Sequence, residues 1–156
     1  MPLTIRAYEA EDARATARLF HETVRDAAGA GYTAAQRRAW SPAVPDLAPW
    51  HERLAGATTM LAEGGDGLVG FMSLGNDGYL DLAFVRADKL GAGVAKALYD
   101  SLLDRARAMG LKTLTTDASH LARRFLHRQG WRVTREQTQS RRGESLANYR
   151  MALDLD

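Results

Sequence analysis

The chain has 156 residues, a hydrophobic fraction of 46% and a formal net charge of +2, so we expect residues 1–156 to form a single domain with a substantial core. The lack of cysteine excludes disulfides, cysteine nucleophiles and thiolate metal sites, and the small net charge gives no argument for a nucleic-acid partner despite a pI of about 9.1. The first residues contain no apolar signal core and no apolar run reaches the length of a membrane span, so we expect a soluble cytoplasmic protein without a membrane partner.

The first forty residues predict a strand followed by two helices. The strand covers residues 3–8, and the first helix covers residues 11–28, where apolar side chains recur every three or four positions. Gly29 and Gly31 are predicted to end this helix, because glycine tolerates the left-handed conformation that closes many helices. Thr33 is suited to cap a second helix that continues to residue 40.

The rest of the chain predicts a third short helix and then strands that alternate with helices. Asp46 is suited to begin the short helix. The predicted strands cover residues 58–63, 68–74, 79–85, 112–116, 131–137 and 146–153, and two longer helices cover residues 93–109 and 119–129. This order of elements predicts an α/β fold.

A short glycine loop, Gly91-Ala-Gly93, stands between the buried strand at residues 79–85 and the long helix after it. Residues 91–95 would present successive backbone N–H groups at a helix start, where the helix dipole also favours an anion. The loop lacks the second glycine and the Lys-Ser/Thr pair of a P-loop, and Lys96 stands where a dinucleotide fingerprint has its third glycine. A nucleotide-binding oxidoreductase is therefore disfavoured, although Asp117 fits that fingerprint loosely. From these residues alone, a plain glycine turn remains an alternative.

The surroundings of the loop are more specific. The segment Val85-Arg-Ala-Asp-Lys-Leu-Gly-Ala-Gly-Val-Ala-Lys-Ala-Leu98 resembles the acetyl-CoA loop of the GNAT acyltransferases, with a match at Gly93 and Ala95 and a departure at Leu90, where the family usually has Gln or Arg. Residues 114–131, which end on a Gly-Trp pair, resemble the family's later strand and helix, and both ends of the chain fit as well. The resemblance implies a GNAT-like mixed central sheet of six or seven strands, flanked by helices and splayed at the central strand.

The resemblance also implies acetyl-CoA as cosubstrate and distributes its parts along the chain. The pyrophosphate would bind the loop residues Leu90, Gly91, Ala92, Gly93, Val94 and Ala95. The pantetheine arm would contact the main chain of Phe84 and Val85, which are also plain core residues of a strand. Ser119 matches a family position that is often Asn and contacts the arm, and it also suits the N-cap of the next helix. Arg123 or Arg124 would reach a CoA phosphate, unless both simply belong to a solvated basic helix face.

Asp81 is the candidate general base. Simple alternation places Tyr79, Asp81, Ala83 and Val85 on one face of the strand and the leucines with Phe84 on the other. Many family members carry Glu at the position of Asp81, and the shorter Asp favours a proton relay through water. The alternative is a solvated or structurally paired aspartate.

The family's usual general acid is a tyrosine four residues before the Gly-aromatic pair, and that position is Leu126 here. Leucine cannot donate a proton, so the CoA thiolate would leave to water or use another donor. His127 lies about 100° around the helix from Leu126 and is not a direct replacement. Tyr99 and Tyr149 are the other phenols to consider.

The acceptor pocket is expected from the first two or three helices, where Tyr32, Gln36 and Trp40 are the candidate contacts. A similar Tyr…Gln…Ala-Trp-Ser-Pro spacing occurs in one branch of the superfamily. Trp40 and Trp50 also fit as anchors of the hydrophobic core, because aromatic side chains dominate cores.

The residues and the resemblance together predict an enzyme that moves an acetyl group from acetyl-CoA to an amine of a small molecule or peptide. The alternative is a catalytically silent CoA-binding or sensor domain on the same fold, which Leu90 and Leu126 favour. The His-Glu pairs at His21 and His51 lack the second histidine of the His-Glu-x-x-His zinc motif, so no metal is expected. The sequence does not specify the acceptor, and it leaves a homodimer open.

Overall fold

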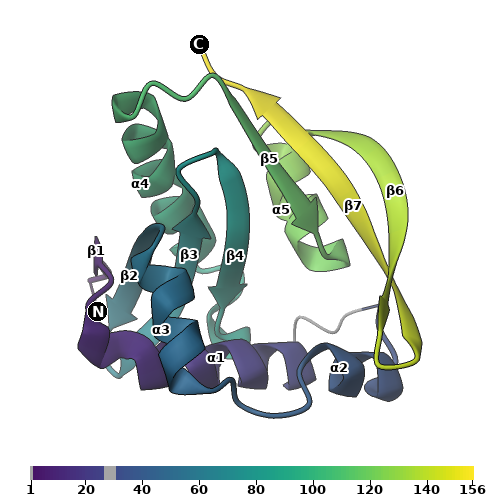
Figure 1. The fold of residues 1–156 in the computed structure, drawn as a ribbon. Helices are drawn as coiled ribbons and strands as arrows, with labels where there is room; N and C mark the ends of the chain where they lie inside the picture. The colour runs from purple at the N-terminus through teal and green to yellow at the C-terminus, as the bar shows by residue number, and fades with distance from the viewer. Residues whose placement is uncertain (1, 27–30) are drawn as a thin grey trace.

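The computed structural model describes residues 2–26 and 31–156, and its centre is a seven-stranded mixed sheet (Figure 1). The strands are β1 (Thr4–Ala7), β2 (Thr58–Gly64), β3 (Gly67–Leu74), β4 (Tyr79–Val85), β5 (Thr113–Ala118), β6 (Arg132–Arg141) and β7 (Glu144–Asp154). They lie in the order β1-β2-β3-β4-β5-β7-β6, and of these seven described strands only β4 and β5 pair in parallel. The predicted mixed sheet is confirmed, and β5, β6 and β7 are longer than the sequence indicated.

In the described part of the chain, five α-helices cover the two faces of the sheet: α1 (Ala13–Asp26), α2 (Ala34–Trp40), α3 (Leu47–Ala55), α4 (Val94–Ala108) and α5 (His120–Arg128). In Figure 1, α1–α3 lie in front of the sheet, and α4 and α5 lie behind it. Thr33 caps α2 as predicted, by accepting a hydrogen bond from the N–H of Gln36, whereas Asp46 precedes α3 without a side-chain cap. The predicted end of the first helix, at residues 27–29, lies outside the described residues.

The sheet splays open between its two parallel strands. β4 and β5 pair only through Tyr79 with Thr115 and Leu80 with Thr116, near the start of β4. The remainder of β4 continues to Val85 and has no strand partner on that side among the residues that the structure describes. The predicted splay at the central strand is therefore confirmed, and it leaves backbone groups of β4 free to face a ligand.

A β-bulge interrupts β4 at Asp81. β3 pairs Ser73 with Leu82 and then Leu74 with Leu80, so Asp81 is an extra residue without an opposite partner. A bulge adds one residue to a strand and so reverses the alternation beyond it. Leu80 packs in the core beneath α4, whereas Leu82 packs in the second core beneath α1 and α3.

The predicted assignment of faces is therefore wrong beyond the bulge. Ala83 and Val85 pack with Leu80 in the α4 core, on the opposite side of the sheet from Asp81. Simple alternation failed because the extra residue is set by the pairing of β4 with β3, which the sequence of β4 alone does not reveal.

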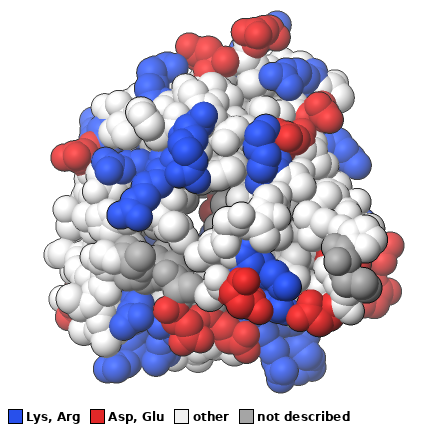
Figure 2. Space-filling model, turned by 180° about the vertical axis from the view of Figure 1, so that it is seen from behind, with Lys and Arg blue, Asp and Glu red and all other residues white. Residues whose placement is uncertain are grey.

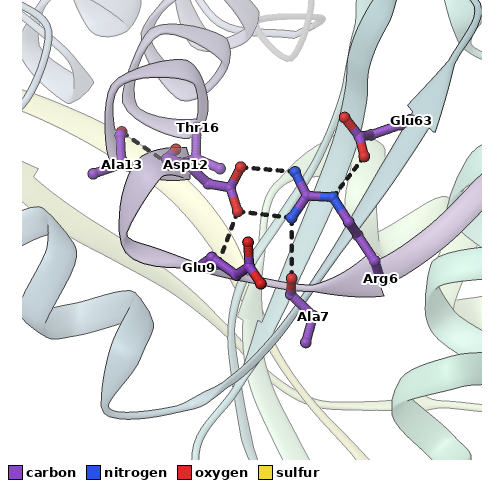
Figure 3. Close-up of polar contacts among 7 residues, drawn as sticks. All are labelled: Arg6, Ala7, Glu9, Asp12, Ala13, Thr16 and Glu63. Carbon is purple, nitrogen blue, oxygen red and sulfur yellow. Dashed lines mark hydrogen bonds and ion pairs between the residues drawn. The ribbon is translucent and has the colours of Figure 1, made fainter.

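One arginine fixes the entry of the chain into the fold (Figure 3). The guanidinium of Arg6 on β1 donates to both carboxylate oxygens of Asp12, at 2.7 and 2.8 Å, and also to Glu63 on β2. Asp12 in turn accepts from the N–H of Glu9 and is the last residue of the 3-10 turn Ala10–Asp12 that leads into α1. The guanidinium holds the pKa of the Asp12 carboxyl below its ordinary value. This network ties β1, β2 and the start of α1 together, away from the splay.

Within residues 2–26 and 31–156, no helix is long and apolar enough to cross a membrane.

Candidate functional site

A cavity of about 710 Å³ follows the splay between β4 and β5. Its loop end is bounded by residues 89–91 and 93–96 and by α5, and its hairpin end is bounded by α2, the start of β4 and the β6–β7 hairpin. Figure 2 shows a hollow in the face that carries α4 and α5, with Lys and Arg side chains around it. The side chains and main chain of β4 therefore line one continuous space that passes from one face of the sheet toward the other.

Main-chain groups form the wall at the loop end. Gly91 and Gly93 adopt positive φ values of 80° and 85°, and a Cβ atom at either would meet nothing within 4 Å. The N–H of Ala92 donates to Lys89, whereas the N–H groups of Gly91, Gly93 and the first turn of α4 have no hydrogen-bond partner within the described residues. Free N–H groups at a helix start in open space are the arrangement that binds a phosphate.

Basic side chains surround this loop, and the structure distinguishes between the two candidate arginines. Lys89, Lys96, Arg124 and Arg128 line the cavity, although Lys96 also pairs with Asp100. Arg123 is not among the lining residues, because its guanidinium lies over the ring of Tyr149, 4.5 Å from the centroid. Arg124 is therefore better placed than Arg123 for an anionic ligand.

Three other predicted contacts lie along the middle of the cavity. Phe84 and Val85 line it from β4, beyond the last pair of residues that joins β4 to β5. Ser119 lines it from the end of β5, and its hydroxyl also accepts the N–H of Ala122 at 3.2 Å, which makes it the N-cap of α5. Both interpretations of Ser119 are thus compatible with its position.

Asp81 lines the cavity as one half of an ion pair. Its carboxylate accepts two hydrogen bonds from Arg53 on α3, at 2.7 and 2.9 Å. The carboxylate is 28% exposed, and the pairing raises the pKa of the Arg53 guanidinium. A carboxylate has about four lone-pair positions, so two remain to accept a proton or to bind water. The sequence allowed for a paired aspartate but did not identify Arg53 as the partner.

A second polar network stands beside Asp81 and was missed by the sequence reasoning. The Tyr79 hydroxyl donates to Asp117 at 2.6 Å, and Arg150 and Gln137 also donate to this carboxylate. Burial and the hydrogen bond to Asp117 raise the pKa of the Tyr79 phenol. Tyr79 stands two residues before Asp81, and only this spacing in a strand could have indicated it.

The three predicted acceptor contacts differ in their positions. Tyr32 and Trp40 line the cavity, with ring centroids 5.7 Å apart. Gln36 does not, because its amide donates to the carbonyl of Ser145 and so joins α2 to β7. Tyr32 is buried, and its hydroxyl donates to the carbonyl of Ala147. Trp50 is a core residue, whereas Trp40 is partly exposed.

Comparison with known proteins agrees with this geometry. Residues 22–153 match the family model of the acetyltransferase (GNAT) domain. The chain belongs to the GNAT acetyltransferase family. It is 30% identical to the uncharacterized N-acetyltransferase YafP of Escherichia coli over 149 residues, which are 96% of this chain and 94% of that protein.

Solved structures of GNAT proteins superpose on the whole chain. A GCN5-related N-acetyltransferase from Rhodopseudomonas palustris is 34% identical in sequence to this chain, and its structure has a TM-score of 0.92 over 99% of this chain and 97% of that one. The paia N-acetyltransferase from Thermoplasma acidophilum, solved with coenzyme A, has a TM-score of 0.78 over 99% and 100% of the two chains. Its identity is only 16%, so this second likeness shows the fold alone.

Leu126 stands at the position that the sequence resemblance gives to the family's usual general acid. Leu126 lines the cavity from α5 and is only 2% exposed, and His127 beside it is exposed to solvent. Tyr99 is buried in the α4 core, where it accepts a hydrogen bond from Trp131, and Tyr149 contacts His120. The phenols that line the cavity are instead Tyr32 and Tyr79.

No cluster of three or more potential metal ligands occurs in the described parts of the chain, 2–26 and 31–156.

Proposed function

We propose that this GNAT protein transfers the acetyl group of acetyl-CoA to an amine of a small molecule or peptide. The observation that carries the proposal is the continuous cavity, which joins the free N–H groups of the glycine loop to Asp81 through the splay. Such a passage lets acetyl-CoA enter from one face of the sheet and the amine reach its thioester from the other face. Bringing two reactants together in a fixed orientation is a large part of the catalysis of a bimolecular reaction.

The loop residues Gly91, Gly93, Val94 and Ala95 would hold the pyrophosphate with their N–H groups, with Arg124 nearby. The open space beside the two glycines has room for a phosphate, since a Cβ atom at either glycine would meet nothing within 4 Å. The pantetheine arm would follow the unpaired part of β4 and contact the main chain of residues 84–85, with Ser119 on the opposite wall.

The chemical step would form a C–N bond and break the C–S bond of the thioester. The amine nitrogen attacks the carbonyl carbon, CoA leaves as the thiolate, and the amine loses one proton. Asp81 would accept that proton, directly or through water, with the two lone pairs that Arg53 leaves free. The thiolate can leave without a protonated side chain at Leu126, because thiols have ordinary pKa values near about 8.5.

The competing function is a CoA-binding domain without catalysis, which the leucines at positions 90 and 126 favour. The test is release of free CoA thiol from acetyl-CoA in the presence of a panel of primary amines, with the acetylated product identified by mass spectrometry. Amine-dependent release with a matching product supports the transferase. Tight CoA binding by calorimetry without release from any amine would establish the silent domain instead.

A further inference from the structure

The hairpin end of the cavity contains a cation without a carboxylate partner. Arg141, near the tip of the β6–β7 hairpin, lines the cavity and donates one hydrogen bond, to the side chain of Gln139 at 2.9 Å. The other charged residues at this end are already paired: Asp81 with Arg53, and Asp117 with Arg150. Among the described residues, no carboxylate lies within ion-pair distance of Arg141.

The cross-strand neighbour of Arg141 does not neutralise it. Glu144 stands opposite Arg141 in the register of the hairpin, yet the two make no ion pair. The hairpin is held in place by other contacts, because Arg142 donates to the carbonyl of Ala39 and Gln36 donates to the carbonyl of Ser145. Arg141 thus lines the cavity from a hairpin that these contacts fix to α2. Figure 1 shows the tip of the β6–β7 hairpin beside α2.

A second unmatched polar group lies on the same face of the hairpin. Asn148 lines the cavity, and its Oδ1 atom is buried without a hydrogen-bond partner among the described residues. A buried acceptor without a donor is unfavourable, so an N–H group of a ligand, or water, is expected to meet it. Asn148 pairs with Gln137, which also contacts Asp117, so this position is level with the polar network beside Asp81.

We infer that the acceptor is an amine that carries a carboxylate or similar anion at a distance, bound by Arg141. This inference rests on the proposed acetyl transfer and narrows its substrate class. The amine would lie near Asn148 and Asp81, and the anion would lie at Arg141, four positions further along β6 than Gln137. Four positions of a strand correspond to about 13 Å between backbone positions. The long side chain of Arg141 can reach part of the way toward the amine, but we expect an α-amino acid to be too short to span the remaining distance. A guanidinium fork matches a carboxylate in geometry as well as charge.

The test is a series of ω-amino carboxylates of increasing chain length, from glycine to 8-aminooctanoate, each compared with its own carboxamide. We expect kcat/KM to favour the carboxylate by about tenfold for the longer members, the scale of one charge-assisted hydrogen-bonded pair, and not for glycine. Arg141→Gln should remove this preference while leaving the carboxamides unchanged. Arg135→Gln is the matched control, because Arg135 is exposed on the same strand and does not line the cavity.

Three results would overturn the inference: no preference for carboxylates, a preference that is greatest for glycine, or an equal loss for both members of each pair in Arg141→Gln. If no amine is acetylated, the proposed function fails, and the anion site is tested by binding alone. Calorimetry with hexanoate and the CoA-bound protein should then show binding that Arg141→Gln weakens and Arg135→Gln does not. Absence of hexanoate binding, or equal binding by both variants, would exclude the site.

Discussion

The two ends of the cavity are built from different kinds of groups. The loop end presents backbone N–H groups of Gly91, Gly93 and the first turn of α4. These donors belong to the main chain, so they do not depend on the identity of a side chain. The hairpin end presents side chains from α2, α3, β4 and the β6–β7 hairpin, and most of its charges are paired with each other. The loop end is therefore suited to a constant ligand such as a pyrophosphate, and the hairpin end can be adapted to an acceptor by changing single side chains.

The largest effect is expected at the hairpin end, where Asp81→Asn should lower turnover without weakening CoA binding. If Asp81 accepts the amine proton, turnover should fall by about 100-fold or more, the usual scale for a positioned base, while CoA affinity stays near normal. Steady-state kinetics and calorimetry measure the two quantities separately. Asp104→Asn is the control, because Asp104 is exposed on α4 and makes no ion pair within the described residues.

A companion variant distinguishes a base from a structural partner. Arg53→Gln removes the ion pair but leaves the carboxylate, so a base should keep most of its activity. If Arg53→Gln and Asp81→Asn lose the same activity, the pair acts only by holding α3 against β4. Wild-type turnover by Asp81→Asn at every pH would remove Asp81 from the mechanism.

At the loop end the second largest effect is expected, and it should appear in binding. Gly93→Val places a side chain in the open space before α4, so CoA should bind at least about tenfold more weakly, as expected when charge-assisted hydrogen bonds to the pyrophosphate are lost. Its φ of 85° also makes valine strained, which by itself would destabilise the fold.

The helix α4 provides a matched control for that strain. Gly110 follows the other end of α4 with a φ of 76° and equally open space around its missing Cβ. Gly110→Val should therefore cost similar stability and leave CoA affinity unchanged in calorimetry. Equal CoA affinity in the two variants would argue against the loop as the phosphate site. Leu90→Ala should have a smaller effect than Gly93→Val, because Leu90 is exposed and offers no hydrogen bond.

This difference between the ends also explains what the sequence could predict. The loop, α4 and the cap at Ser119 depend on residues close together in the chain, so the order of glycines and apolar residues was enough to place them. The partner of Asp81 depends on the docking of α3, and the choice between Arg123 and Arg124 depends on how α5 packs against Tyr149. Such contacts join distant segments, and no local pattern encodes them.

The bulge in β4 is the clearest case of this limit. Alternation is a local rule, and it was correct for Tyr79 and Asp81. The offset that follows arises because β3 pairs with Leu80 and Leu82 and leaves Asp81 out. Register is a property of two strands, so a single strand's sequence could not reveal the reversal at Ala83.

The third effect is expected in the free energy of unfolding, from a substitution outside both ends of the cavity. Asp12→Asn removes the ion pair with Arg6 and weakens the turn before α1, so the free energy of unfolding should fall by about 1–2 kcal/mol with no change in KM. Urea unfolding at neutral pH measures it. Glu11→Gln is the control, since Glu11 is an exposed carboxylate in the same turn.

The stabilisation by Asp12 should depend on pH in a defined direction. The hydrogen bonds from Arg6 lower the pKa of Asp12 below its ordinary value of 3.8. A lowered pKa means that the stabilisation is complete above the unfolded value and is lost as the pH falls through the folded one. The difference between wild type and Asp12→Asn should therefore shrink below about pH 4, and a difference that grows in acid would contradict the assignment.

The smallest effect on the rate is expected at Leu126, which lines the loop end of the cavity from α5. This side chain is 2% exposed and lines the cavity, so a larger ring there should cost about 1–3 kcal/mol of stability through overpacking. Leu126→Tyr and Leu126→Phe share that cost, and they differ only in the hydroxyl. If the phenol reaches the sulfur, the tyrosine variant should be several-fold faster than the phenylalanine variant, because a positioned acid assists a leaving group that already departs tolerably well.

The pH profile of the native protein completes this comparison. Burial raises the pKa of both phenols that line the cavity, Tyr32 and Tyr79, so neither should lose its proton near neutral pH. We expect the rate to show no alkaline decline that belongs to a tyrosine, because no phenol assists the thiolate in the native protein. A steep alkaline limb that Tyr79→Phe or Tyr32→Phe abolishes, and that Tyr99→Phe in the α4 core leaves intact, would show that a phenol from the hairpin end has replaced the missing acid. The two ends of the cavity would then share the chemistry of the thioester, because the acid for a CoA held at the loop end would come from the side that binds the acceptor.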